Sequence, residues 1–234
     1  MINPKIILTA LGVFLLTGFS TEKNTAPPSD SPIVQVKKII KDVTFRANPD
    51  QSDWGKVKVG LILSDGGQVK TGSSSLALVH FIDGSGLLRV RENSILNIYG
   101  KSENKKMSKN TFINKGTIGF EVNKQAEDEE FKFTTPTVVA SIRGTEGFIE
   151  HNDIDTTSTI FLNTGSATFQ TLSGEEGTLG SGNTLKVNKD GSYLLSSSTA
   201  EDSTRFKSSK STTTRQVIIR TRNGDIKIEY LQDK

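Results

Sequence analysis

Apolar and polar side chains alternate with a period of two residues through most of this 234-residue chain. From Ile33 onward the alternation recurs in short segments, such as residues 76–82, 117–122 and 138–142. Successive side chains of a β-strand point to opposite faces, so this pattern predicts strands that each bury one face. No segment has a strong helical pattern. The chain is therefore expected to be all-β.

Tight-turn signals separate these segments at regular intervals. Gly and Asp supply the positive φ or the side-chain-bonded turn that a sharp reversal needs. Examples are Asp65-Gly66-Gly67, Asp83-Gly84-Ser85 and Thr164-Gly165-Ser166. Short, evenly spaced strands fit a sandwich, a barrel or a solenoid, and no exact internal repeat chooses between them. We predict one solenoid-like or sandwich-like β domain over residues 33–195.

Two polar stretches and a hairpin complete the predicted organisation. Residues 100–110 are polar and predict a solvated loop, and the Ser/Thr-rich residues 196–214 predict a linker. Asn223-Gly224, flanked by segments rich in Ile and Val, predicts a C-terminal β-hairpin over residues 215–234. A lone hairpin is marginally stable in water, so we expect it to dock on the main sheet or on a partner.

The N-terminus reads as an export signal. Lys5 precedes an uncharged run over residues 6–19, which is short for a bilayer span of about 20 residues. Gly18 and Ser20 are small residues that fit cleavage after Ser20. Residues 1–20 are predicted to be a signal peptide or, if uncleaved, an anchor that holds the chain on the inner membrane. In both cases the rest is exported, to the periplasm or the medium, and residues 21–32 form a flexible linker.

Composition excludes several classes of protein. The chain has no cysteine, so disulfides, thiolate metal sites and cysteine nucleophiles are absent. Phe19 stands where a lipoprotein box has its lipidated cysteine, so no lipid of that kind is expected. The formal net charge of +3 comes from scattered basic residues, which argues against nucleic-acid binding. Only two histidines are present, and we predict no metal site and no cofactor.

Several ordered motifs resemble the FecR domain, the periplasmic sensor domain of bacterial cell-surface signalling regulators. A Trp and Gly lead into a Gly-rich turn, a later strand ends in Asp-Gly-Ser, and a Thr-Pro strand leads into Arg-Gly-Thr-Glu. The resemblance spans about residues 33–170. The motif residues, expected to be structural, are Trp54, Gly60, Thr71, Gly72, Asp83, Gly84, Ser85, Thr135 and Pro136.

The resemblance implies a solenoid-like β domain that senses or binds an envelope component. FecR-type regulators carry a cytoplasmic segment that restrains a sigma factor, and almost nothing precedes the apolar run here. The chain therefore resembles a stand-alone, exported version of the family without that segment. We expect an envelope protein or a glycan as its partner.

The residues Arg143, Gly144, Thr145 and Glu146 are the candidate binding site. In the functional interpretation, Arg143 offers a fork of donors to a carboxylate and Gly144 allows close approach of a backbone. In the structural interpretation, Gly144 makes a strand bend, Thr145 bonds the turn backbone and Arg143 pairs with Glu146 or a nearby carboxylate. The sequence leaves both open and favours the second.

No catalytic constellation is evident, so the chain is expected not to be an enzyme. His80, Asp83 and Ser85 are too close along one strand and its turn to converge as a catalytic set. His151 reads as part of a solvated turn, and the acidic run over residues 127–130 lacks the spacing of a calcium loop. Two alternatives remain: a structural envelope protein, or an enzyme acting on cell-wall polymers with Glu146 and Glu150 as acid and base.

Overall fold

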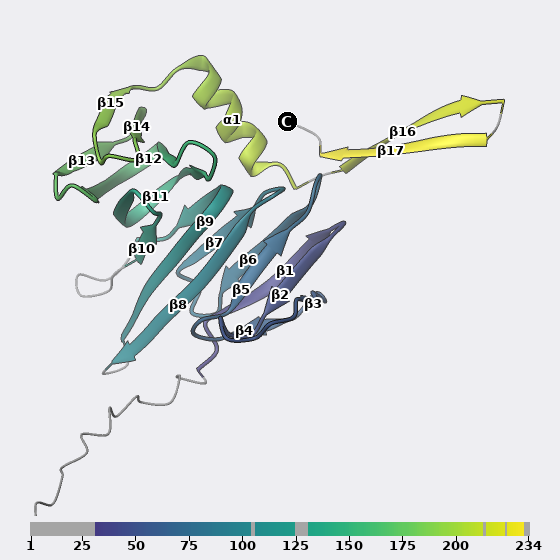
Figure 1. Ribbon diagram of the computed structural model, residues 1–234, viewed down its shortest axis with the longest axis horizontal. Helices are drawn as coiled ribbons and strands as arrows, with labels where there is room; N and C mark the ends of the chain where they lie inside the picture. Colours follow the sequence, from purple (N-terminus) through teal and green to yellow (C-terminus); the bar gives the residue numbers. More distant parts are fainter. Residues whose placement is uncertain (1–30, 104–105, 125–130, 213, 223, 232–234) are drawn as a thin grey trace, which may run out of the picture.

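The computed structural model describes residues 31–103, 106–124, 131–212, 214–222 and 224–231. They form a 15-stranded sheet, one helix and a separate two-stranded sheet (Figure 1). The strands of the large sheet are β1 (Val34–Ile40), β2 (Val43–Arg46), β3 (Gly55–Lys56), β4 (Ile62–Leu63), β5 (Gln68–Thr71), β6 (Leu76–Phe81), β7 (Gly86–Val90), β8 (Ile95–Glu103), β9 (Lys106–Val122), β10 (Phe131–Thr134), β11 (Val138–Asn152), β12 (Thr157–Thr171), β13 (Glu176–Gly180), β14 (Asn183–Val187) and β15 (Tyr193–Ser197). The predicted all-β fold is confirmed.

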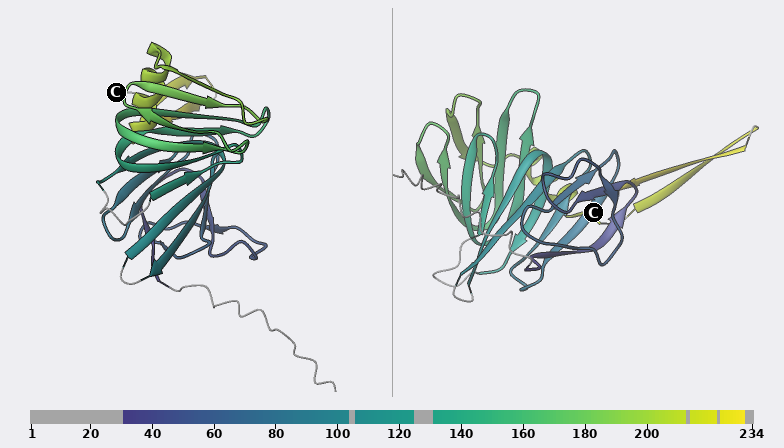
Figure 2. Two further views of the ribbon diagram at one scale, coloured as in Figure 1. Left: turned by 90° about the vertical axis from the view of Figure 1, so that its left-hand side faces the viewer. Right: turned by 60° about the horizontal axis from the view of Figure 1, so that its bottom comes forward.

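Three long strands, β9, β11 and β12, fold the sheet into two layers because each changes partners halfway along. The first half of β9 lies between β8 and β10, and its second half lies between β7 and β11. The first half of β11 and the second half of β12 continue the layer of β10 and end at β13, which we call layer A. Their other halves continue the layer of β7 and end at β14 and β15, which we call layer B. Figure 2 shows the strands coiling from one layer into the other.

A glycine with positive φ marks each crossing between layers. Gly116 in β9, Gly144 in β11 and Gly165 in β12 have φ of 87°, 65° and 80°. The register of β11 shifts between Arg143 and Glu146, which is the signature of a β-bulge. The extra residue changes which side chains point inward. Up to Ile142 these are the even-numbered residues, and from Thr145 onward they are the odd-numbered residues. We call the edge with Gly144 and Gly165 the corner edge.

One hydrophobic core fills the space between the layers. The rings of Phe120 in layer B and Phe133 in layer A lie 4.8 Å apart, and those of Phe81 and Phe131 lie 4.8 Å apart. These residues belong to one buried cluster with inward-facing Val, Ile and Leu side chains of both layers. Burial of apolar surface between two sheets is the main driving force for this arrangement.

An α-helix replaces most of the linker predicted over residues 196–214, so that prediction was wrong. Helix α1 (Ala200–Lys210) begins at a capping box in which Thr199 and Asp202 bond to each other's backbone N–H. Phe206 is its main apolar anchor and packs on Phe161 of layer B, with ring centroids 5.3 Å apart. A helix held by so few apolar contacts leaves almost no periodic signal in the sequence.

The polar residues 100–110 also differ from the prediction, because their described part is strand rather than loop. β8 and β9 run on past Gly100 as a two-stranded ribbon, with Gly100 opposite Lys109 and Lys101 opposite Ser108. A two-stranded ribbon exposes much of its surface to water, so polar side chains suit it as well as they suit a loop.

The predicted C-terminal hairpin is present as β16 (Thr214–Thr221) and β17 (Gly224–Leu231). Figure 1 shows it projecting from the body rather than lying on the main sheet, contrary to one expectation. Docking on a partner remains a prediction. The predicted signal or anchor, most of the linker over residues 21–32, and the acidic run lie outside the described residues. No described helix is long and apolar enough to span a membrane.

Candidate functional site

The Thr-Pro motif builds a buried polar network at the edge opposite the corner edge. Thr135 Oγ1 accepts hydrogen bonds from the Val138 backbone N–H at 3.1 Å and from Ser158 Oγ at 2.8 Å. Thr137 Oγ1 donates to Ser158 Oγ at 2.7 Å. Since Thr135 and Thr137 lie in the turn of layer A and Ser158 lies on β12 of layer B, the network ties the two layers together. Thr135 thus contributes to the contact between the two layers.

His151 belongs to the same network, so the predicted solvated turn was wrong for this residue. Its side chain is buried and its Nδ1 lies 3.0 Å from Ser158 Oγ. Burial lowers the pKa of His151 below its ordinary value, since it penalises the charged imidazolium, and the nearby Asp153 and Asp155 only partly oppose this shift. Ser158 is fully buried and His151 is only 3% exposed, so little of this pair reaches solvent.

At the corner edge, Gly144 and Gly165 stack against each other. A Cβ on Gly165 would lie 2.4 Å from the Gly144 carbonyl oxygen and 2.5 Å from Thr145 Cγ2. Gly144 therefore lies at the bend of β11. Thr145 is buried, but its Oγ1 has no hydrogen-bond partner among the described residues, so it does not bond the turn backbone as expected.

Glu146 and Glu150 hold helix α1 on layer B. Glu146 Oε1 lies 2.5 Å from Lys210 Nζ, and Glu150 pairs with Arg205 and accepts a hydrogen bond from Thr117 at 2.8 Å. The partner of Glu146 is therefore a helix lysine rather than Arg143. Each carboxylate that could have served as acid or base is already occupied by a cation of the helix.

Arg143 is the one residue of the Arg-Gly-Thr-Glu motif whose side chain faces solvent. It has no hydrogen bond or ion pair with any described residue. In β11 it follows Val139 and Ser141 on the same outer face of layer A, since residues two apart in a strand share a face. The motif thus divides into one outward cation and three residues with structural contacts.

The Asp-Gly-Ser motif forms a turn that is closed by a buried lysine. Asp83 Oδ1 accepts from the Ser85 N–H at 3.0 Å, and Asp83 Oδ2 lies 2.6 Å from Lys109 Nζ. Gly84 supplies the positive φ of 75°. Burial raises the pKa of the Asp83 carboxyl, but hydrogen bonds from Lys109 and Ser85 outweigh it and leave the pKa lowered.

The remaining motif residues also make structural contacts. Thr71 is buried and accepts a hydrogen bond from the Ser94 N–H at 3.0 Å. The Gly72 N–H donates to the Asp42 carbonyl at 2.9 Å, and a Cβ on Gly72 would crowd the Asp42 carboxylate. The Arg46 guanidinium packs over the Trp54 ring, 4.4 Å from the ring centroid. Gly60 occupies a turn with φ of 93°.

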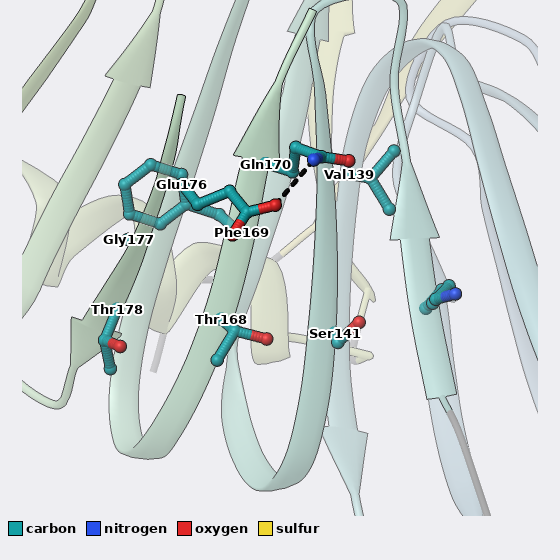
Figure 3. Close-up of a pocket in the computed structure, with 9 residues that line it drawn as sticks. Val139, Ser141, Thr168, Phe169, Gln170, Glu176, Gly177 and Thr178 are labelled. Carbon is teal, nitrogen blue, oxygen red and sulfur yellow. Dashed lines mark hydrogen bonds between the residues drawn. The ribbon is translucent and has the colours of Figure 1, made fainter. Parts of the chain in front are cut away.

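A shallow groove crosses the outer face of layer A and was not evident from the sequence. Its central part, of about 560 Å³, is lined by Lys132, Val139, Ser141, Thr168, Phe169, Gln170, Glu176, Gly177 and Thr178. Figure 3 shows hydroxyl and amide side chains of three strands along it, with Gln170 Nε2 donating to Glu176 at 2.7 Å. The paired strands place these side chains in register, Ser141 beside Thr168 and Thr168 beside Thr178.

A second depression of about 530 Å³ continues the groove toward the Thr-Pro turn. It shares Val139 and Gln170 with the first and adds Phe112, Pro136 and the exposed Leu172. The groove therefore has an apolar end at Pro136, a polar middle, and Arg143 beyond Ser141 on the same strand face. The alternation of β11 could have predicted that these residues share a face, but not which strands lie beside them. Among the described residues, no cluster of His, Asp and Glu could hold a metal ion.

The family model described as FecR protein matches residues 67–168. This chain carries a FecR domain. The matched residues include the Asp-Gly-Ser, Thr-Pro and Arg-Gly-Thr-Glu motifs, whereas Trp54 and Gly60 lie before them. The matched part of the FecR domain comprises β5–β11 and most of β12. Pro136 and Ser141 of the groove, and Arg143 beyond it, fall within the matched residues.

Two solved structures resemble the chain in fold. Both are described as a "putative anti-sigma factor" from Parabacteroides distasonis ATCC 8503, with TM-scores of 0.52 and sequence identities of 14% and 15%. Each match covers 60% of this chain and 64% of the other, so the chain spans less than two thirds of these structures. At this identity the likeness is one of fold. No curated protein matches the chain.

Proposed function

We propose that this protein is a binding and sensing module of the bacterial envelope, which holds a partner in the groove on layer A. The observation that carries the proposal is the position of the groove. It runs along β11 of the FecR domain from Pro136 to Ser141, and the exposed Arg143 lies two residues further on the same strand face. Rigid paired strands present its side chains, so the site is formed before a partner arrives and ordering it costs little.

The chemistry of the groove suits an extended segment of a partner protein. Phe112, Pro136 and Val139 offer an apolar end, the hydroxyl and amide side chains offer hydrogen bonds, and the exposed Arg143 offers a guanidinium for an acidic group. The ligand lies on a sheet face, where backbone pairing is unavailable, so side chains carry its recognition.

A glycan is the second candidate partner. The hydroxyl and amide row formed by Ser141, Thr168, Gln170 and Thr178 favours it, because such groups donate to and accept from sugar hydroxyls. The two partners are separated by the experiment below, which identifies the material captured.

A photo-crosslinking amino acid at Ser141 tests the proposal in living cells. We expect covalent adducts from Ser141 and none above background from the control position Lys58, which is exposed on the turn between β3 and β4. When Arg143→Glu is combined with the photo-crosslinking amino acid at position 141, the yield of adducts should fall several-fold. Protease-sensitive adducts indicate a protein and muramidase-sensitive adducts a glycan. Equal capture at both positions contradicts the proposal.

We also propose that the protein is exported and does not act as an enzyme. Export is supported by the apolar run over residues 6–19 and by the FecR domain. The non-enzymatic role is supported by the pairing of Glu146 and Glu150 with Lys210 and Arg205. A mature N-terminus at Thr21 in a soluble envelope fraction is the expected outcome, whereas recovery of the chain in the cytosol contradicts export.

A further inference from the structure

Strand β15 is an unprotected edge of layer B. It pairs with β14 on one side only, and all five of its residues are exposed, including Leu194 at 63% and Leu195 at 42%. Natural sheets protect their edges with very short strands, charges, proline or bulges. The other described edge strands follow this rule, since β3 and β4 have two residues each and β13 carries the charged Glu176. β15 has none of these devices, because its sequence is Tyr-Leu-Leu-Ser-Ser.

The backbone of β15 presents a symmetric set of unused hydrogen-bonding groups. The Ser198 N–H donates to the Gly182 carbonyl at 2.9 Å, and the Asn188 N–H donates to the Ser192 carbonyl at 2.8 Å. In an antiparallel pair every second residue is bonded to the partner strand, so residues 194 and 196 also direct their backbone groups toward β14. Residues 193, 195 and 197 therefore direct their N–H and C=O groups away from the sheet, and this set is symmetric about Leu195.

We propose that a second copy of this chain occupies that edge, so that two β15 strands pair antiparallel about a twofold axis at Leu195. In this register Leu195 lies opposite Leu195 of the other copy, and Tyr193 lies opposite its Ser197. The two Leu194 side chains become diagonal neighbours on the outer face. Every outward backbone group of one copy then meets its complement, as a closed twofold interface requires. Layer B becomes continuous across the dimer.

The side chains of the edge support pairing between identical copies. β15 has no charge, so a second copy meets no like-charge repulsion along the strand. The Tyr193 ring contacts Phe169 edge-on, with 5.2 Å between the ring centroids, so Tyr193 lies on the core side of layer B. Leu195 lies on the same side, because residues two apart in a strand share a face, and it is exposed at the edge of the sheet. The pairing therefore covers apolar surface as well as backbone groups. The proposal does not depend on the groove, which lies on layer A.

The test compares the purified protein with Leu195→Lys and with Ile154→Lys. Leu195→Lys places two lysines opposite each other on the axis, whereas Ile154 is 92% exposed in the turn between β11 and β12 and serves as the matched control. In sedimentation over a concentration series, the wild type and Ile154→Lys should reach twice the chain mass. Leu195→Lys should raise the dimer Kd at least about tenfold while keeping the same circular-dichroism spectrum.

A cysteine at the axis gives a second measurement, since the chain has no native cysteine. Leu195→Cys should form a crosslinked dimer with a short bifunctional thiol reagent, whereas Ile154→Cys should stay monomeric under the same conditions. A monomeric wild type at about 100 μM, or a dimer that Leu195→Lys does not weaken, would overturn the proposal. Crosslinking of Leu195→Cys to another envelope protein, with no self-crosslink, would also overturn it.

Discussion

Lys109 Nζ lies 2.6 Å from Asp83 Oδ2, and this ion pair joins the two layers at the corner edge. Lys109 projects inward from β9 and its side chain is fully buried, whereas the Asp83 side chain is 35% exposed at the turn between β6 and β7. A buried ammonium needs a partner because taking a charge out of water is costly. The Asp of the Asp-Gly-Ser motif thus both forms a turn and neutralises a lysine distant in sequence.

Asp83→Asn should lower the free energy of unfolding by about 2–3 kcal/mol, because it removes the ion pair between Asp83 and the buried Lys109. The partial exposure of Asp83 keeps this below the cost of breaking a fully buried pair. Asp190→Asn is a matched control, since Asp190-Gly191-Ser192 forms the same kind of turn with the Ser192 N–H donating to Asp190 at 3.0 Å, but at an exposed position. Urea unfolding measures both. An equal loss of stability in the two variants would show that Asp83 stabilises the fold through its turn rather than through its ion pair with Lys109.

Gly165→Ala should destabilise the fold far more than Gly182→Ala. Both residues have positive φ, 80° and 73°, so each alanine bears a backbone cost of about 1 kcal/mol. Only at Gly165 does the new methyl group clash with backbone, the Gly144 carbonyl, which adds roughly 1–3 kcal/mol of overpacking. The Gly182 position has nothing within 4 Å. A similar change in thermal midpoint for the two variants would contradict the stacking of the corner glycines.

Phe206→Ala should release helix α1 from layer B. The Phe206 ring is buried against Phe161, and its loss should cost about 2–3 kcal/mol, somewhat less than for a phenylalanine of the main core. Hydrogen exchange of residues 200–210 should become much faster, while that of β6 and β7 changes little. Lys207→Ala, at an exposed position of the same helix, is the control and should leave exchange near the wild-type rate.

His151 should make the fold sensitive to mild acid. Its pKa is lowered by burial, so below its unfolded value of about 6.5 the unfolded chain binds a proton that the folded chain does not. The free energy of unfolding should therefore fall as the pH drops below about 6.5, by at most ~1.4 kcal/mol per pH unit from this group. Asp83, whose pKa is also lowered, adds a separate loss only below about pH 4.

His151→Gln should flatten the stability profile between pH 7 and 5, although the variant is less stable at pH 7 because the contact with Ser158 changes. His80 also has a lowered pKa, caused first by burial and then by Lys37 and Arg89, so His80→Gln is the variant to compare. If the free energy of unfolding depends on pH in the same way in the wild type and in His151→Gln, groups other than His151 cause the acid sensitivity.

The strands could be predicted from the sequence because a strand leaves its pattern in residues that are neighbours along the chain. Alternation at Val138, Ala140 and Ile142 reflects the pleat of a strand, and the glycines in the turns reflect backbone angles that other residues avoid. The helix escaped prediction because Phe206 alone carries most of its packing. The Thr199 and Asp202 capping box was its one clear sequence signal.

The candidate site was predicted only in part. The favoured interpretation paired Arg143 with Glu146 or a nearby carboxylate, whereas Glu146 lies under helix α1 and Arg143 faces solvent, because Lys210 is distant in sequence and close only in the fold. His151 was misplaced for the same reason, since its partner network includes Thr135 and Thr137 of the other layer. The groove combines side chains of five strands, β9 to β13, and a sequence pattern does not specify which strands are neighbours.

The sequence by itself determined that this chain forms short strands around an apolar core, with a FecR-type order of motifs and a C-terminal hairpin. Only the tertiary structure decided that three long strands cross between layers, that Asp83 meets Lys109, and that a groove and a bare edge face outward. The physical reason is that strand formation depends on neighbouring residues, whereas ion pairs, layer crossings and surfaces depend on contacts between segments far apart in the chain.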